Sequence, residues 1–292
     1  MTPDGIYYTG FADEAAKGID GQIAATTALG WSNIEARAID GVNLTDISDL
    51  QFDLVAQKLS DAGVTVNCFG SAISNWAKDV LDPADTSFEE TDRAITRMQT
   101  LGAKLIRIMS YKVYEDREPG DQDKAARFET LRRIVDRFLD AGLQPVHENC
   151  MNFGGMGWEY TQELLDNVPG LKLVYDTGNP VFLADRAQPR PYPRQNPWEF
   201  YSHVRDHIAY IHIKDCVYRS DDDVTYTFPG EGDADVKRIL ADLLGRGYQG
   251  GISIEPHMAV VFHDAAQSSD EQVRFNNYVE YGRRLESLVA SL

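Results

Sequence analysis

The sequence predicts an α/β protein, a (β/α)8 TIM barrel that occupies residues 1–292 as a single domain. Apolar strand-like runs and amphipathic helix-like runs alternate eight times, and no linker or low-complexity segment interrupts them. This alternation is typical of a parallel sheet with crossover helices. An open sheet that binds a dinucleotide would be expected to carry GxGxxG after an early strand, and the sequence has none. Eight units within 292 residues therefore favour a closed barrel.

The first half of the chain contains four units in which a glycine ends the helix. Glycine adopts the left-handed conformation that closes a helix, and the next strand follows it at once. The units are strand 6–10 with helix 21–29 and Gly30, strand 32–36 with helix 50–62 and Gly63, strand 64–69 with helix 88–101 and Gly102, and strand 104–110 with helix 124–141 and Gly142.

The second half contains four more units, with longer connections. A Pro-rich stretch follows the sixth strand, and an acidic loop follows the seventh. The units are strand 144–148 with helix 159–167, strand 172–176 with helix 197–208, strand 210–214 with helix 234–246, and strand 251–255 with helix 270–289.

Composition and charge exclude several classes of partner. The net charge is −18, from 46 acidic and 28 basic residues, and no basic run occurs. Because proteins that bind a phosphate backbone gather Lys and Arg on one face, we expect neither nucleic acid nor an anionic membrane as partner. The chain has no apolar run of the roughly 20 residues that span a bilayer, and its start lacks the pattern of a secretory signal. We therefore expect a cytoplasmic protein.

The last four expected strands each end in a residue that can ligate a hard metal ion. These runs read PVHENC, LVYDTGN, AYIHIKD and ISIEPH, and the candidate ligands are Glu148, Asp176, His212 and Glu255. Any one of them alone is better explained as a loop-edge acid or a core histidine. Barrel enzymes, however, build their active sites where the strands end, and several buried carboxylates without a cation would be very unfavourable. The four together predict a site for one divalent metal ion, Mn²⁺, Mg²⁺ or Co²⁺, with Zn²⁺ as an alternative.

These motifs resemble those of the xylose isomerase-like barrels, which include ketose 3-epimerases, hydroxypyruvate enzymes, inosose enzymes such as inosose dehydratase, and apurinic endonuclease IV. The resemblance spans most of the chain and is strongest from 143 to 257. It rests on Glu-Asn in HENC, Asp-Thr-Gly in YDTGN, His-x-Lys-Asp in HIKD, Gly-Glu-Gly-Asp at 230–233 and the Glu of IEPH. It implies that the four candidate ligands bind the metal, and that Glu148 and Glu255 are also the catalytic acid/base pair.

The endonuclease branch of that family differs from this sequence. It uses three zinc ions and several more histidines, whereas the third and fourth expected strands end in CFGSA and RIMSY. Asn179 stands where a histidine follows Asp-Thr-x in many relatives, and GEGDAD replaces an Asp-x-His. The sequence thus supports one metal ion and argues against DNA repair.

The expected chemistry follows from a metal ion with open coordination positions. Polarisation of a carbonyl stabilises the enediolate that forms when the adjacent C–H bond is broken. We therefore expect a metal-dependent isomerase or epimerase that acts on a ketose or keto-sugar. A dehydratase or lyase acting on a keto-sugar or inosose is the first alternative, and a non-catalytic sugar-binding barrel is the second. A small, unphosphorylated carbohydrate is the expected partner, and a homo-oligomer, common among the relatives, is left open.

Further candidates lie near the same strand ends. His147 is a candidate catalytic proton carrier, although strand alternation turns it away from Glu148 and leaves a structural role open. The expected substrate contacts are Lys214, Asp215, His257, Asn179 and Trp158. Arg107 lies inside an apolar strand and needs a buried partner, for which we expect Glu35.

Overall fold

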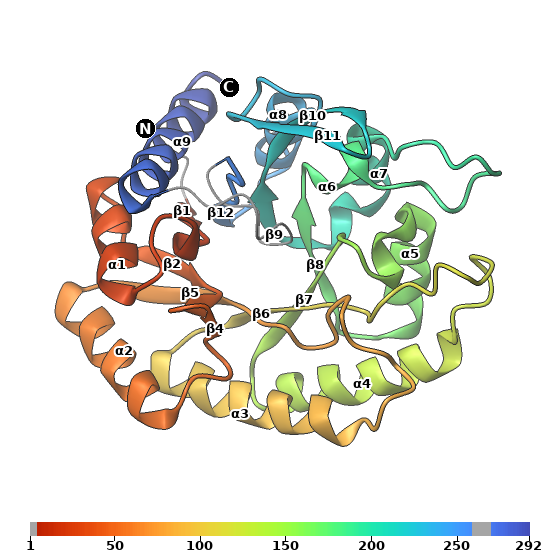
Figure 1. Ribbon diagram of the computed structural model, residues 1–292, viewed down its shortest axis with the longest axis horizontal. Helices are drawn as coiled ribbons and strands as arrows, with labels where there is room; N and C mark the ends of the chain where they lie inside the picture. The colour runs from red at the N-terminus through yellow and green to blue at the C-terminus, as the bar shows by residue number, and fades with distance from the viewer. Residues whose placement is uncertain (1–4, 259–269) are drawn as a thin grey trace.

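The computed structural model describes residues 5–258 and 270–292 and shows a ring of strands surrounded by helices (Figure 1). The barrel strands are β1 (Ile6–Gly10), β2 (Asn33–Ala36), β5 (Thr65–Gly70), β6 (Leu105–Ile108), β7 (Gln144–Glu148), β8 (Lys172–Asp176), β9 (Ile208–Ile213) and β12 (Gly250–Ile254). They pair in parallel in the order β1-β12-β9-β8-β7-β6-β5-β2. A parallel bridge between Phe11 and Glu35 brings the two edges of the sheet together. The predicted (β/α)8 barrel is confirmed.

Within residues 5–258 and 270–292, eight longer helices pack around this sheet. They are α1 (Ile19–Ala28), α2 (Asp49–Ala62), α3 (Asp85–Leu101), α4 (Lys124–Asp140), α5 (Trp158–Asn167), α7 (Pro197–Val204), α8 (Val236–Gly245) and α9 (Glu271–Ala290). Ser48 and Gln51 form a capping box at the start of α2, and Gly63 ends that helix at a φ of 65°. Gly102 ends α3 in the same left-handed conformation, at 71°. The predicted helix ends therefore follow from the local chemistry of serine and glycine.

Alternation along the strands separates the interior of the barrel from its outer face. Four interior side chains form a small buried cluster, Cys68, Val146, Val174 and Tyr210. In a strand, the residue two positions further on points to the same face. For Val146, Val174 and Tyr210, these residues are Glu148, Asp176 and His212. The outward residues between them, such as Tyr175 and Ile211, join the large core beneath the helices. The alternation of side chains along these strands thus directs three candidate ligands to the barrel axis.

Several connections carry structure that the sequence reading assigned to loops. They contain the hairpins β3 (Ala38–Ile39) with β4 (Val42–Asn43) and β10 (Asp215–Ser220) with β11 (Asp223–Thr227), and the short helix α6 (Asn179–Phe182). The expected acidic loop after the seventh strand is therefore a hairpin, and both of its arms contain the β-branched and aromatic residues typical of strands, as in VY of β10 and VTYT of β11. Within the two described ranges, no helix combines the length and apolar character needed to cross a bilayer.

Candidate metal centre

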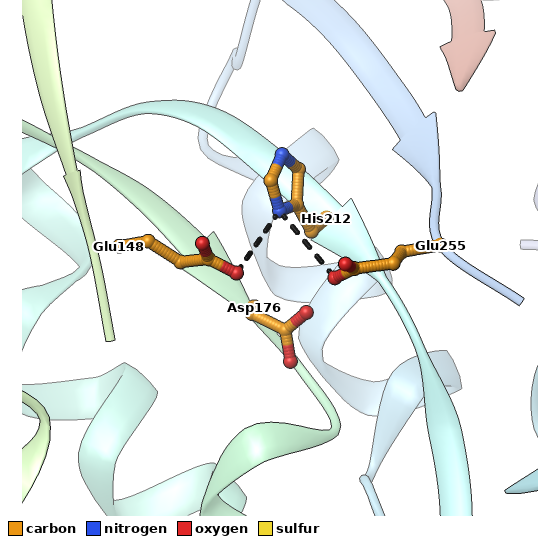
Figure 2. A group of neighbouring side chains, drawn as sticks. All are labelled: Glu148, Asp176, His212 and Glu255. Atoms are coloured by element: carbon orange, nitrogen blue, oxygen red, sulfur yellow. Dashed lines mark ion pairs between the residues drawn. The ribbon is translucent and has the colours of Figure 1, made fainter. Parts of the chain in front are cut away.

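The four predicted ligands meet at the C-terminal end of the barrel (Figure 2). They are all buried, and one ligand atom of each lies within 4.8 Å of those of the other three: Glu148, Asp176, His212 and Glu255. Figure 2 shows Glu148 and Glu255 approaching from opposite sides, with Asp176 and His212 between them. The structure therefore gathers three carboxylates and one imidazole around a common point.

In each carboxylate, the protein fixes one oxygen and leaves the other facing that point. The fixed oxygens and their donors are Oε2 of Glu148 with Arg107 (2.9 Å), Oε1 of Glu255 with Arg37 (3.0 Å), and Oδ1 of Asp176 with the backbone N–H groups of Gly178 and Asn179 (2.9 and 2.7 Å). Such outer contacts orient ligand side chains in metal sites.

The imidazole of His212 is oriented in the same way. Its Nε2 lies 3.1 Å from both carboxylate oxygens of Glu35, which is fully buried. Its Nδ1 lies 3.4 Å from Oε1 of Glu148 and 3.9 Å from Oε2 of Glu255, and has no hydrogen-bond partner among the described residues. A proton on Nε2 would thus be held by Glu35, which leaves Nδ1 to face the common point as a ligand.

The electrostatics of this group show an excess of negative charge. Burial raises the pKa of Asp176 to about 7, although Lys214 acts in the opposite direction. Burial disfavours the charged form of His212, but Glu35 and Glu148 outweigh it and raise its pKa to about 10. Protons on Asp176 and His212 would offset part of this excess, as a bound cation would. The donor set of three oxygens and one nitrogen fits a hard divalent ion, which would supply that charge.

The ammonium group of Lys214 faces the same point. Its Nζ lies 3.0 Å from Oδ2 of Asp176 and 3.1 Å from Oε2 of Glu255, and its side chain is buried. These are two of the oxygens that would ligate an ion, so Lys214 and a bound ion would contact the same carboxylate oxygens.

Three of the five expected substrate contacts line the cavity above this centre. They are Asn179, Lys214 and His257. The side-chain nitrogen of Asn179 is buried and has no hydrogen-bond partner among the described residues, so it can donate to a bound molecule. His257 receives support from Glu14, which accepts hydrogen bonds from its Nδ1 and its backbone N–H at 2.9 and 2.8 Å.

The other two expected substrate contacts lie elsewhere. Asp215 uses its carboxylate to accept hydrogen bonds from backbone N–H groups of the connection after β11, including those of Gly230 and Ala234. Trp158 stacks on His203 between α5 and α7, with the two ring centroids 3.7 Å apart. Neither lines the cavity, and we leave both out of the proposed substrate contacts.

His147 also lies away from the centre. Its ring is fully buried on the outer face of β7, where Nε2 lies 3.0 Å from both Ser110 and Asn152. Burial lowers its pKa to about 4. This placement fits the structural alternative and gives no support to a role as proton carrier.

The prediction that Arg107 pairs with Glu35 was wrong. Arg107 donates to Glu148, whereas Glu35 reaches across the barrel and accepts from Tyr210 and His212. The partner of a buried residue depends on which side chains meet across the barrel, which strand order alone does not give.

Comparison with known proteins agrees with this architecture. Residues 23–277 match the family model of the xylose isomerase-like TIM barrel. The chain belongs to this family. No curated protein matches it significantly in sequence.

Solved structures of the xylose isomerase-like fold cover nearly the whole chain. A barrel protein of this kind from Mycobacterium smegmatis, in complex with magnesium, is 18% identical with a TM-score of 0.68, and the match covers 98% of this chain and 97% of that one. The IOLI protein with a bound zinc atom is 16% identical with a TM-score of 0.73, over 98% of each chain. A D-tagatose 3-epimerase-like protein is 16% identical with a TM-score of 0.71, over 97% of each chain. At these identities, the likeness shows the fold.

Charged residues that follow the first two strands also reach this centre, although the motifs of the last four strands do not indicate them. Arg37 follows β2, and its guanidinium contacts Asp13 and Glu14 beyond β1 as well as Glu255. The available signal was the same as for the ligands, namely charged residues directly after two strands whose ends meet the others at one edge.

Proposed function

We propose that this protein is a divalent-metal-dependent isomerase or epimerase that acts on a ketose or keto-sugar through an enediolate. We also propose Glu148, Asp176, His212 and Glu255 as the metal ligands. The supporting observation is the arrangement of one inward atom from each of these side chains around a common point, with the opposite atom fixed by the protein.

A divalent ion bound there would polarise the substrate carbonyl as a Lewis acid. The protein's own groups would move the proton. Burial opposes the charge on Glu148, but Arg107 and His212 outweigh it and lower its pKa to about 2, so Glu148 is held in the form that accepts a proton. Glu255 lies on the opposite side of the centre. Removal of a proton on one face and its replacement from the other would invert a carbon centre, whereas return of the proton to the neighbouring carbon would isomerise the sugar.

Cavity residues would orient the sugar. The unpartnered side-chain nitrogen of Asn179 would donate to a hydroxyl group, and His257 would contact the substrate from the side of Glu255. Both would hold the sugar chain so that the reacting C–H bond lies between the two glutamates.

The test is incorporation of solvent deuterium into recovered sugars, over a panel of ketoses and keto-glucosides, with Mn²⁺ or Mg²⁺ present. We expect exchange at one carbon, its loss with a chelator, and a fall of at least about 100-fold in Glu148→Gln or Glu255→Gln. Glu163→Gln, at a half-exposed ion pair with Lys124, is the matched control. No exchange from any sugar by the metal-loaded protein would contradict the proposal.

A metal-dependent dehydratase or lyase is the second candidate, and Lys214 is the observation that favours it. Its ammonium touches two ligand carboxylates and lines the cavity, so it could protonate a departing hydroxyl group. In that case the same incubations, followed by ultraviolet absorbance, would show a new double bond, and its formation would require the metal ion. A non-catalytic sugar-binding barrel would instead bind saccharides tightly, with the affinity unchanged by Glu148→Gln and Glu255→Gln.

A further inference from the structure

The cavity directly above the four ligands is small. It has a volume of about 50 Å³, and Glu148, Glu255, Lys214 and Asn179 contribute to its wall. Pockets that enclose small-molecule ligands typically measure about 300–1,000 Å³. This site cavity therefore accounts for only part of an enclosed ligand.

A second cavity adjoins the first. It has a volume of about 260 Å³, and Cys150, Met151 and Phe182 line both cavities. Its remaining wall comes from the connection after β7 and from the long connections after β6 and β8, the last two of which extend on the right-hand side of the barrel in Figure 1. We call this second space the side cavity. It shares part of its wall with the cavity at the proposed reaction centre.

The wall of the side cavity is largely apolar. Its apolar side chains include Val113, Met151, Met156, Phe182, Leu183 and Ala184. Its two arginines are each paired with a carboxylate, Arg186 with Glu115 and Arg194 with Asp221. Paired arginines at the edge favour a neutral, apolar occupant over an anion. An apolar cavity of about 150 Å³ already holds benzene, so an aromatic ring has room here.

The short helix α6 links the two cavities. Asn179 begins it and offers its unpartnered nitrogen to the site cavity, while Phe182, three residues later, lies in the wall that both cavities share. Residues three apart lie on one face of a helix. One ligand could thus accept a hydrogen bond from Asn179 through a hydroxyl group and, at the same time, pack an apolar group against Phe182.

We propose that the substrate is a keto-glycoside, a glycoside whose sugar ring carries the reacting ketone, with this ring at the metal centre and an apolar, aromatic aglycone in the side cavity. This inference rests on the proposed function and names its substrate class. A free monosaccharide would leave the side cavity to water, whereas an aglycone would bury its apolar wall.

The experiment measures binding without turnover, by calorimetry in Mn²⁺-loaded protein. The probes are phenyl and methyl D-glucopyranosides in both anomeric forms. We expect at least one phenyl glucoside to bind about tenfold or more tightly than its methyl counterpart, because the ring removes apolar surface from water. Ala184→Phe and Val113→Phe, which fill the side cavity from different walls, should bring this ratio close to one.

Ala187→Phe is the matched control, because Ala187 is exposed three residues beyond Ala184 and does not line the side cavity. It should preserve the ratio. Unchanged binding of the methyl glucosides in the filled variants would show that the site cavity is intact. The proposal is overturned if neither phenyl glucoside binds more tightly, or if both filled variants keep the preference. Absence of deuterium exchange together with a phenyl preference would reject the proposed reaction and keep the side cavity as a binding site.

Discussion

Glu35 and His212 meet across the inside of the barrel, although they belong to strands that are not neighbours. Glu35 is on β2 and His212 is on β9, and Nε2 of the imidazole lies 3.1 Å from the carboxylate. Glu35 also accepts hydrogen bonds from Tyr210 and Ser253. The carboxylate is thus fixed by three side chains, and it orients the ring that faces the other three proposed ligands.

Glu35→Gln should weaken metal binding by about 10- to 100-fold. Glutamine keeps the size of the side chain but loses the charge that makes the imidazole a stronger ligand. Competition with a chromophoric chelator measures the affinity. Glu163→Gln removes a carboxylate from a surface ion pair and should leave it unchanged. Equal affinity of Glu35→Gln and the wild type would show that Glu35 only packs against the ring.

Lys214→Met should keep or strengthen metal binding and still lower turnover by about 100-fold or more. The ammonium contacts two carboxylate oxygens that would ligate the ion, so its removal relieves repulsion between the two cations. Turnover falls because the substrate loses a charged donor. Metal titration and the deuterium-exchange assay measure the two effects, with Lys124→Met as the control. Loss of metal binding in Lys214→Met would mean that Lys214 instead holds the ligand carboxylates in place.

The sequence was informative wherever a local signal decides the structure. Glycines that end helices located the first four units, and Gly63 and Gly102 adopt the left-handed conformation that this role requires. The convergence of the four candidate ligands could be predicted because strand alternation is local, and the C-terminal ends of parallel strands share one edge. The hairpin of β10 and β11 was missed because its acidic turn was read as the whole connection.

The contacts around the ligands could not be predicted in the same way. Arg107 and Glu35 are both buried and of opposite charge, yet each pairs with a different residue, Glu148 and His212 respectively. Which side chains meet depends on the twist of the barrel and on side-chain length, and neither can be read from spacing along the chain. Trp158 likewise lies near a strand end in sequence but packs between two helices.

Arg107→Met should destabilise the metal-free protein by about 3 kcal/mol or more, because it leaves Glu148 buried without its cation. The double variant Arg107→Met with Glu148→Gln should be more stable than the sum of the two single effects predicts. Urea unfolding in the presence of a chelator measures all four proteins. Arg137→Met, which breaks an exposed pair with Asp92, should cost less than about 1 kcal/mol. Strict additivity in the cycle would show that the pair is not coupled.

His147 should make the protein less stable as the pH falls from neutral to 5. In the unfolded chain, its imidazole takes up a proton near its ordinary pKa of 6.5, whereas burial lowers the pKa in the folded protein to about 4. Between these values the unfolded state binds more protons, so stability present above pH 6.5 is lost progressively down to about pH 4. For a fully buried ring this amounts to about 2 kcal/mol between pH 7 and pH 5.

His147→Gln has no group at this position that titrates in this range, so the unfolding free energy of this variant, measured in urea with a chelator, should fall less over the same interval. An equal fall in both proteins would show that His147 keeps its ordinary pKa and that other groups set the acid sensitivity.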